Sequence, residues 1–194
     1  MTKEKWYRLV YDVLRPIAAL VYPQRISGVE NIPEGPAIFC APHSNIVDPI
    51  LISLALGRDT FTHHLAKAES KTTFIFGWLM KKAGSIFVKR GARDIDSFKQ
   101  CMRVLKAGEK LIVFPEGTRV HGDAVVEPKS GVIHMSVRLH VPIVPVYIPR
   151  DKKVFRKVPT VIGEPYYPEV GDHRDYDRLA RELMGRIWAL KPEE

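Results

Sequence analysis

The sequence predicts an α/β fold with a mostly parallel central sheet flanked by helices and an amphipathic helix at the N-terminus. Strand-like apolar segments alternate with helix-like segments along the chain, which is typical of this class. The 194 residues suffice for one domain with a sizeable core. A hydrophobic fraction of 45% and a charged fraction of 27% are those of a globular protein. We therefore expect a helix over residues 1–24 and a domain over residues 25–194.

The N-terminal segment, residues 7–22, is apolar but does not have the pattern of a transmembrane span. Asp12, Arg15 and Pro16 interrupt it, and it falls short of about 20 apolar residues. No small-residue cleavage site follows, so it is not a signal peptide. Helical spacing links Trp6, Leu9, Val10, Val13, Leu14 and Ile17, with lysines and arginines nearby. This pattern predicts a helix in a membrane interface, with Trp6 and Tyr7 at headgroup level. A helix packed on its own domain is the other interpretation.

The remaining elements alternate in type. A polar turn region over residues 27–35 leads into the first of four predicted strands, at 36–43, 61–69, 85–90 and 110–119, and a further strand is expected at 141–148. Helices are expected between or after them, at residues 48–56, 72–84, 94–109, 130–140 and 176–190. Because ligands bind beyond the carboxyl ends of strands in such sheets, we expect polar residues that follow strands to gather at one edge. Those residues are His43, Lys67, Arg90 and Arg119.

Charge and cysteine content restrict the partners. The formal net charge of +8 favours anionic partners, such as a phosphorylated substrate or an acidic membrane surface. The basic residues are spread along the chain and no nucleic-acid motif is present, so we expect no nucleic acid. Cys40 and Cys101 lie in apolar surroundings and predict neither a disulfide framework nor a metal site.

His43 and Asp48 stand five positions apart, where a strand gives way to a helix. On one continuous helix such residues would point about 140° from each other, so they can meet only if the chain bends between them. The loop around Ser44 and Asn45 permits that bend. A carboxylate bonded to one ring nitrogen would fix the tautomer and leave the other nitrogen free to take a proton. A solvated loop histidine is the alternative.

The segment "FPEGTR", residues 114–119, ends a predicted strand in a tight turn at Pro115 and Gly117. Backbone N–H groups at such a turn, together with the fork of Arg119, suit phosphate oxygens. A surface turn with an exposed ion pair is the alternative interpretation.

With these motifs in order, the sequence resembles the glycerophosphate and lysophosphatidic acid acyltransferase family. Its four blocks correspond to "HSNIVD" (43–48), "GSIFVKR" (84–90), "FPEGTR" (114–119) and "VPIVPVYI" (141–148), with "LAKAE" (65–69) and "KSG" (129–131) as further matches. The resemblance spans residues 25 to 150, roughly. Pro42, Val120 and His134 depart from the usual family pattern, and they put substrate preference in doubt more than activity.

The resemblance implies that residues 25–194 are an acyltransferase domain. Its reaction would move a fatty acyl chain from an acyl thioester, acyl-CoA or acyl carrier protein, to the sn-2 hydroxyl of 1-acylglycerol 3-phosphate, giving phosphatidic acid. His43 would be the general base and Asp48 would orient it, without metal or further cofactor. The acceptor phosphate would be bound by Lys67, Arg90, Glu116, Gly117, Thr118 and Arg119. Within this set, Glu116 would order the loop or touch the glycerol.

The implied location is the cytoplasmic face of a membrane, as a peripheral protein on an anionic surface that holds the lysophospholipid. Three alternatives remain: transfer to glycerol 3-phosphate, transfer to another lysolipid, and a phospholipid-binding module without catalysis.

Overall fold

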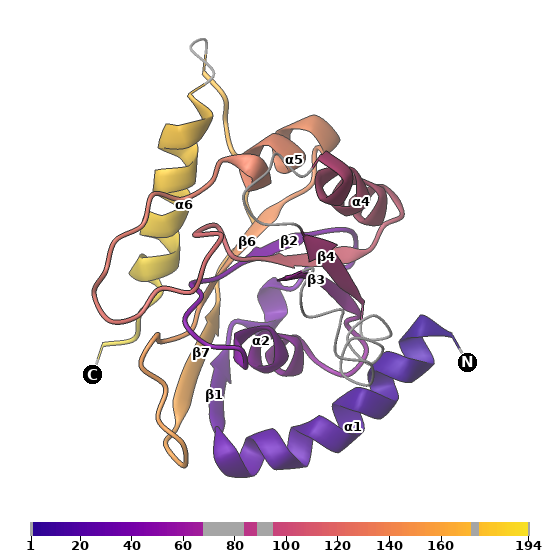
Figure 1. Cartoon of the computed structure of the whole chain (residues 1–194), viewed down its shortest axis with the longest axis vertical. Helices are drawn as coiled ribbons and strands as arrows, with labels where there is room; N and C mark the ends of the chain where they lie inside the picture. Colours follow the sequence, from indigo (N-terminus) through magenta and orange to yellow (C-terminus); the bar gives the residue numbers. More distant parts are fainter. Residues whose placement is uncertain (1, 68–83, 89–94, 172–174, 194) are drawn as a thin grey trace.

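The computed structural model describes residues 2–67, 84–88, 95–171 and 175–193, and it has the predicted α/β architecture (Figure 1). Within these residues, seven strands form one sheet in the order β1-β7-β6-β2-β5-β3-β4. Neighbouring strands are parallel except β6 and β7, which are antiparallel. The strands are β1 (Gln24–Ser27), β2 (Ile38–Cys40), β3 (Thr62–Lys67), β4 (Ser85–Val88), β5 (Lys110–Val113), β6 (Ile143–Tyr147) and β7 (Val158–Ile162).

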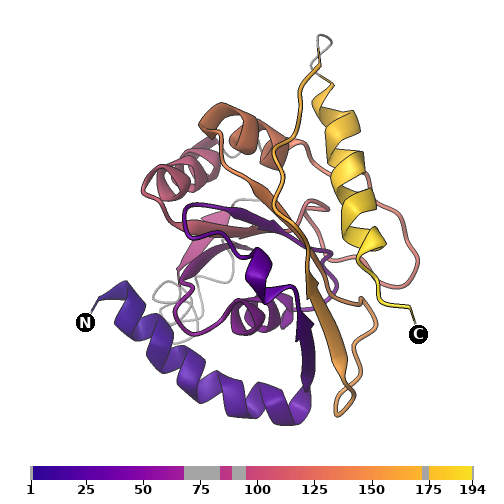
Figure 2. The ribbon, with the colours of Figure 1, turned by 180° about the vertical axis from the view of Figure 1, so that it is seen from behind.

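Helices cover both faces of the sheet (Figures 1 and 2). They are α1 (Lys3–Val21), α2 (Asp48–Leu56), α4 (Ile95–Lys106), α5 (Gly131–Leu139) and α6 (Tyr176–Ala189), with a short 3₁₀ helix, η1 (Val29–Asn31). Because successive strand residues point to opposite faces, β2 contributes to two cores. Phe39 packs with Leu51 and Ile52 of α2, whereas Ile38 and Cys40 belong to the core formed with α4, α5 and α6.

Two strands differ from the sequence-based expectation. Neither β1 nor β7 was predicted: Gln24 ends the expected N-terminal helix and Ser27 begins the expected turn region. They pair in parallel with each other at one edge of the sheet, and β7 joins β6. β1 reads "QRIS" and is largely exposed, so it lacks the apolar alternation that marks a half-buried strand. The helix predicted at 72–84 lies outside the described residues, apart from Gly84. The strand predicted at 85–90 is described as far as Val88, where β4 ends.

The N-terminal helix α1 packs on α2 through two tyrosines. The Tyr7 hydroxyl lies 3.1 Å from the Ser53 carbonyl oxygen and 3.2 Å from that of Gly57. The Tyr11 hydroxyl donates to the Leu54 carbonyl at 3.2 Å. Tyr7 is therefore buried, and the expectation that it lies at membrane headgroup level is wrong.

The opposite side of α1 carries an exposed apolar stripe, namely Leu9, Val13, Ile17 and Leu20. At 100° per residue these four positions fall within about 80° of one another and point away from Tyr7 and Tyr11. Among the described residues, no helix combines the length and the hydropathy that crossing a bilayer requires.

Candidate active site

The predicted pair meets at the carboxyl end of β2. His43 lies three residues beyond β2, the chain turns over Ser44 and Asn45, and Asp48 opens α2. His43 Nδ1 lies 3.0 Å from Asp48 Oδ2. The imidazole also stacks on the Phe114 ring, with centroids 4.1 Å apart. A ring held on one face by an aromatic side chain and at one nitrogen by a carboxylate is fixed in orientation.

Asp48 is fully buried and anchors the turn that precedes it. Its Oδ2 accepts hydrogen bonds from the backbone N–H groups of Ser44 and Asn45, both at 2.7 Å. Burial alone would raise the pKa of Asp48, but the bond to His43, the charge of Lys152 and the Asn45 N–H outweigh it, and the pKa is lowered. The group is therefore a carboxylate at neutral pH, able to accept a bond from Nδ1–H of His43.

Glu116 holds the backbone of His43 from the turn after β5. Its Oε2 accepts the His43 N–H at 2.7 Å, and its Oε1 pairs with Arg150 Nη2. Its side chain has no exposed surface. The sequence analysis placed Glu116 in the phosphate-binding set, where it would order the loop or touch the glycerol. In the structure its carboxylate faces the protein, and a buried anion would repel phosphate, so its position is that of a support for His43.

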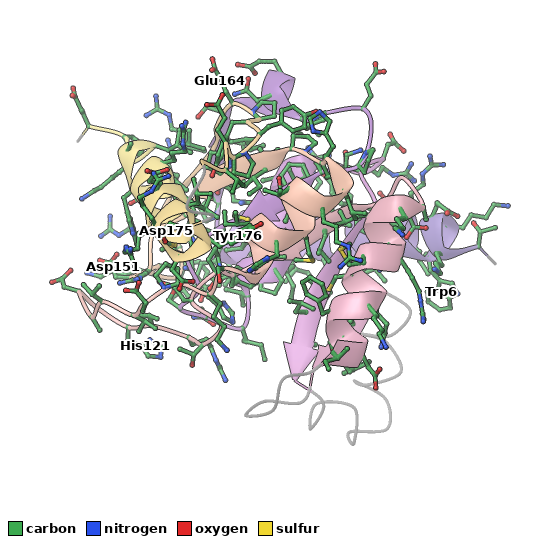
Figure 3. All side chains as sticks on the ribbon, turned by 90° about the horizontal axis from the view of Figure 1, so that it is seen from above. Trp6, His121, Asp151, Glu164, Asp175 and Tyr176 are labelled. Carbon is green, nitrogen blue, oxygen red and sulfur yellow. The ribbon has the colours of Figure 1, made fainter. Side chains whose placement is uncertain are left out.

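Two cations that the sequence analysis missed follow β6. Arg150 pairs with Glu116, donates from Nη1 to the carbonyls of Gly122 at 3.1 Å and Ala124 at 2.9 Å, and lies over the Trp188 ring. Lys152 Nζ lies 2.8 Å from Asp48 Oδ1. Figure 3 shows the segment after β6, at Asp151, beside the loop that carries His121. Arg119 was predicted as a site residue because it follows a strand of the parallel sheet. The same reasoning applies to Arg150 and Lys152, because β6 lies parallel to β2 in the sheet.

The "FPEGTR" turn is tied to the end of β2. The Val120 N–H donates to the His43 carbonyl at 2.7 Å, and the Gly117 N–H donates to the Phe114 carbonyl at 3.0 Å. Gly117 has φ +65°, and a Cβ there would lie 2.8 Å from Lys129 Cε, so the lysine stem packs directly over the glycine. The positive φ favours a glycine here, and a side chain at this position would also displace the end of Lys129.

The structure brings only some of the predicted phosphate-binding residues to this edge. Gly117, Thr118 and Arg119 follow β5, beside β2, and the Arg119 side chain is exposed. Lys67 is the last residue of β3, which pairs with β5 in parallel, so its backbone lies at the same edge. Arg90 lies outside the described residues.

Two other features stay apart from this site. Cys40 is fully buried in β2, and burial raises the pKa of its thiol, which disfavours a thiolate nucleophile. A cavity of about 790 Å³ near α4, α5 and the start of α6 is lined by residues such as Phe98, His134 and Tyr176, and none of the predicted site residues borders it. In the described part of the chain, no group of three or more His, Cys, Asp or Glu residues is arranged to hold a metal ion.

Comparison with known proteins gives a consistent result. A family model described as "Acyltransferase" matches residues 24–149. The chain is 31% identical over 172 residues to the lyso-ornithine lipid O-acyltransferase of Pseudomonas aeruginosa, covering 88% of this chain and 62% of that protein. It is 30% identical over 169 residues to the 1-acyl-sn-glycerol-3-phosphate acyltransferase of Bacillus subtilis, covering 83% of this chain and 82% of that protein.

A solved structure shares the fold. The crystal structure of the 1-acyl-sn-glycerophosphate acyltransferase PlsC from Thermotoga maritima superimposes with a TM-score of 0.70 at 24% identity, covering 99% of this chain and 79% of that one. The chain spans less than two thirds of the length of several curated relatives that it matches.

Proposed function

The chain belongs to the acyltransferase family, and from this premise we propose that it moves a fatty acyl chain from an acyl thioester to the sn-2 hydroxyl of 1-acylglycerol 3-phosphate, giving phosphatidic acid. Acyl-CoA or acyl carrier protein supplies the thioester. The observation that carries the proposal is the 3.0 Å contact between His43 Nδ1 and a buried, ionised Asp48. A relative with the same reaction in its name covers most of this chain at 30% identity.

In this mechanism His43 is the general base. Its Nδ1–H donates to Asp48, so Nε2 keeps its lone pair and takes the proton of the sn-2 hydroxyl. The freed oxygen attacks the thioester carbonyl, and the tetrahedral intermediate collapses to ester and thiolate. The imidazolium then returns the proton to the thiolate. No acyl-enzyme forms, in keeping with the burial of Cys40.

The acceptor phosphate is held by cations beyond the strand ends. Arg119 supplies an exposed guanidinium at the "FPEGTR" turn, with Gly117 and Thr118 beside it, and Lys67 ends a strand of the same parallel set. Arg90 completes the clamp in this proposal. Such a clamp makes the attack effectively unimolecular by holding the hydroxyl near His43.

A second acceptor has support from one relative. The protein of Pseudomonas aeruginosa is named for lyso-ornithine lipid, whose headgroup is an amino acid. Transfer to a lysolipid of that kind is therefore the alternative. An acceptor panel separates the two, since Arg119→Ala should raise KM for the phosphorylated acceptor by about tenfold or more while hardly affecting an acceptor without phosphate.

We further propose that the protein docks on an anionic membrane through α1 and the loop after β6. The docking surface comprises Leu9, Val13, Ile17, Leu20, Val154 and Phe155, all exposed. The Phe155 N–H donates to the Val21 carbonyl at 2.7 Å, which joins the loop to the end of α1. Lys153, Arg156 and Lys157 flank the apolar tip and suit anionic headgroups. A peripheral position on the cytoplasmic face is part of this proposal.

Purified protein incubated with palmitoyl-CoA, or with acyl carrier protein that carries a palmitoyl thioester, should release free thiol when lysophosphatidate is added. His43→Ala should reduce the rate by about 10² to 10⁴, the range of general base catalysis. His134→Ala is the matched control, because His134 stacks on Tyr176 across the sheet from α2. Thiol release by His43→Ala at the rate of His134→Ala would refute the base assignment. A wild-type protein that binds lysophosphatidate without releasing thiol would indicate the non-catalytic module instead.

Vesicle flotation tests the docking surface. The double variant Leu20→Ser with Phe155→Ser should show a severalfold lower fraction bound to phosphatidylglycerol vesicles than wild type. Vesicles of pure phosphatidylcholine should bind little of the wild type or of the double variant. Val125→Ser removes a valine that is 93% exposed elsewhere and serves as the control. Deleting α1 would be a poorer test, since Tyr7 and Tyr11 pack it on α2. Equal flotation of both variants would contradict the proposed surface.

A further inference from the structure

A buried lysine stands behind the acidic member of the pair. Lys152 Nζ lies 2.8 Å from Asp48 Oδ1, with the lysine side chain 1% and the aspartate side chain 0% exposed. We propose that Lys152 is a positioning residue for acyl transfer: its ammonium balances the charge of Asp48 and thereby sets the pH range in which His43 accepts a proton. This inference rests on the proposed role of His43 as the base.

The surroundings of Lys152 are built to hold an ammonium. The ammonium of Lys152 forms an ion pair with Asp48 Oδ1, and it donates hydrogen bonds to the Ser44 hydroxyl at 3.0 Å and to the Pro149 carbonyl. Ser44 in turn donates to the Arg150 carbonyl at 2.7 Å, which fixes the turn between His43 and Asp48 against this segment. Lysine is almost never fully buried unless it is paired, and here a carboxylate and two oxygen acceptors surround the ammonium.

Asp48 divides its two oxygens between different tasks. Oδ2 receives His43 and two backbone N–H groups, whereas Oδ1 faces Lys152. If Lys152 were absent, Oδ1 would remain buried without a charge partner. The negative charge of the carboxylate would then act on the imidazole without a cation to offset it.

The balance around His43 is one of paired charges. Among the described residues, the charged side chains bonded to His43 or to its carboxylate partners are Asp48, Glu116, Arg150 and Lys152. The two anions and two cations of this bonded set balance each other. Removing the Lys152 charge makes the set one unit more negative, which favours the imidazolium and should keep His43 protonated up to a higher pH.

The expected size of this effect follows from Coulomb's law. Two unit charges about 7 Å apart at an effective dielectric constant of about 20 shift a titration by roughly 1 to 2 pH units. Lys152→Met should therefore move the acid limb of the kcat/KM profile upward by about 1 to 2 units. Below pH 7 this variant should lose most of its kcat/KM, and it should regain part of it at alkaline pH. Lys106→Met makes the same change of charge at an exposed position at the end of α4 and should leave the limb in place.

Ring NMR supplies a readout that does not depend on turnover. The His43 signal is assigned by its loss in His43→Ala. Its titration midpoint without substrate should rise in Lys152→Met but not in Lys106→Met. If the wild type showed no acyl transfer, this shift would still be measurable, so the two proposals fail separately. A uniform loss of activity with an unmoved limb and midpoint would mean that Lys152 has only a structural role, and it would overturn the inference.

A second comparison keeps the inference testable if Lys152→Met folds poorly. Asp48→Asn leaves the ammonium facing a neutral amide, and Asp48→Asn with Lys152→Met removes both buried charges. The inference requires the His43 midpoint to be higher in the double variant than in Asp48→Asn alone, because only the double variant lacks the nearby cation. Equal midpoints in these two proteins would overturn it.

Discussion

The buried pair of Glu116 and Arg150 gives the sharpest prediction about stability. The Glu116 side chain has no exposed surface and that of Arg150 is 12% exposed, so Arg150→Met would leave a carboxylate buried without its cation. Removing one partner of a buried ion pair costs about 3 to 5 kcal/mol, a large part of a typical stability of about 5 to 15 kcal/mol. Glu116→Gln keeps an oxygen for the His43 N–H, but its amide N–H₂ replaces the oxygen that accepts from Arg150, so the charge-assisted bond to Arg150 is lost. We expect it to cost about 1.5 to 3 kcal/mol.

Urea unfolding followed by circular dichroism measures these losses. Glu116→Gln with Arg150→Met should lose less than the sum of the single variants, with a coupling of about 1 to 3 kcal/mol, since neither charge is then left alone. Arg178→Met is the control, because Arg178 pairs with Glu182 where both side chains are nearly half exposed. That surface pair should contribute about 1 kcal/mol or less.

The outcome also decides what Glu116 does. If Arg150→Met were no less stable than Arg178→Met, the buried pair would not support the fold and the reasoning would fail. If Glu116→Gln kept full stability but raised KM for the phosphorylated acceptor, Glu116 would contact substrate, as the sequence alone had predicted.

Three further predictions concern other parts of the fold. Burial, followed by the neighbouring His63, lowers the pKa of His64 from 6.5 to about 4. As the pH falls, the unfolded chain therefore binds a proton at His64 before the folded protein does. The contribution of neutral His64 to the stability of the fold is present above about pH 6.5 and is lost as the pH falls toward 4. His64→Gln should make the decrease of Tm between pH 6.5 and 4 smaller than in wild type. Tyr7→Phe removes the hydroxyl that bonds α1 to α2 and should lower the free energy of unfolding by about 1 kcal/mol, with slower hydrogen exchange in wild type as a second measure. Gly117→Ala combines a strained φ with a contact to Lys129 and should destabilise more than Gly108→Ala, whose φ is +81° but whose Cβ meets nothing, as paired melting curves can show.

The sequence was sufficient for the elements with strong periodicity and for the pair at their junction. The helix at residues 48–56 is confirmed with the same bounds, because its apolar run follows a clear start at Asp48 and Pro49. β1 could not be predicted, since it is a polar edge strand whose formation depends on pairing with β7. β7 contains Pro159, which argues against a strand by local rules, yet its burial alternates residue by residue.

For the candidate site too, local sequence predicted one part and tertiary packing determined the other. A bend between His43 and Asp48 was needed for their contact, and local residues alone indicated it. The two cations near that pair, Arg150 and Lys152, come from more than 100 residues further along the chain, and in the sequence they have the pattern of ordinary surface charges after a strand. Their burial depends on the packing of β6 beside β2 and of Trp188 over Arg150, which no local pattern reveals.

The distance along the chain between anions and cations has a consequence for biosynthesis. During translation, His43, Asp48 and Glu116 leave the ribosome well before Arg150 and Lys152, so two acids meant for a dry interior have no counter-ion in the nascent polypeptide. The region that matches the family model, residues 24–149, stops one position short of Arg150. A fragment trimmed to that region would keep the histidine and both acids. It should be unable to bury them, because the cations that pair with Asp48 and Glu116 in the described part of the chain would have been removed.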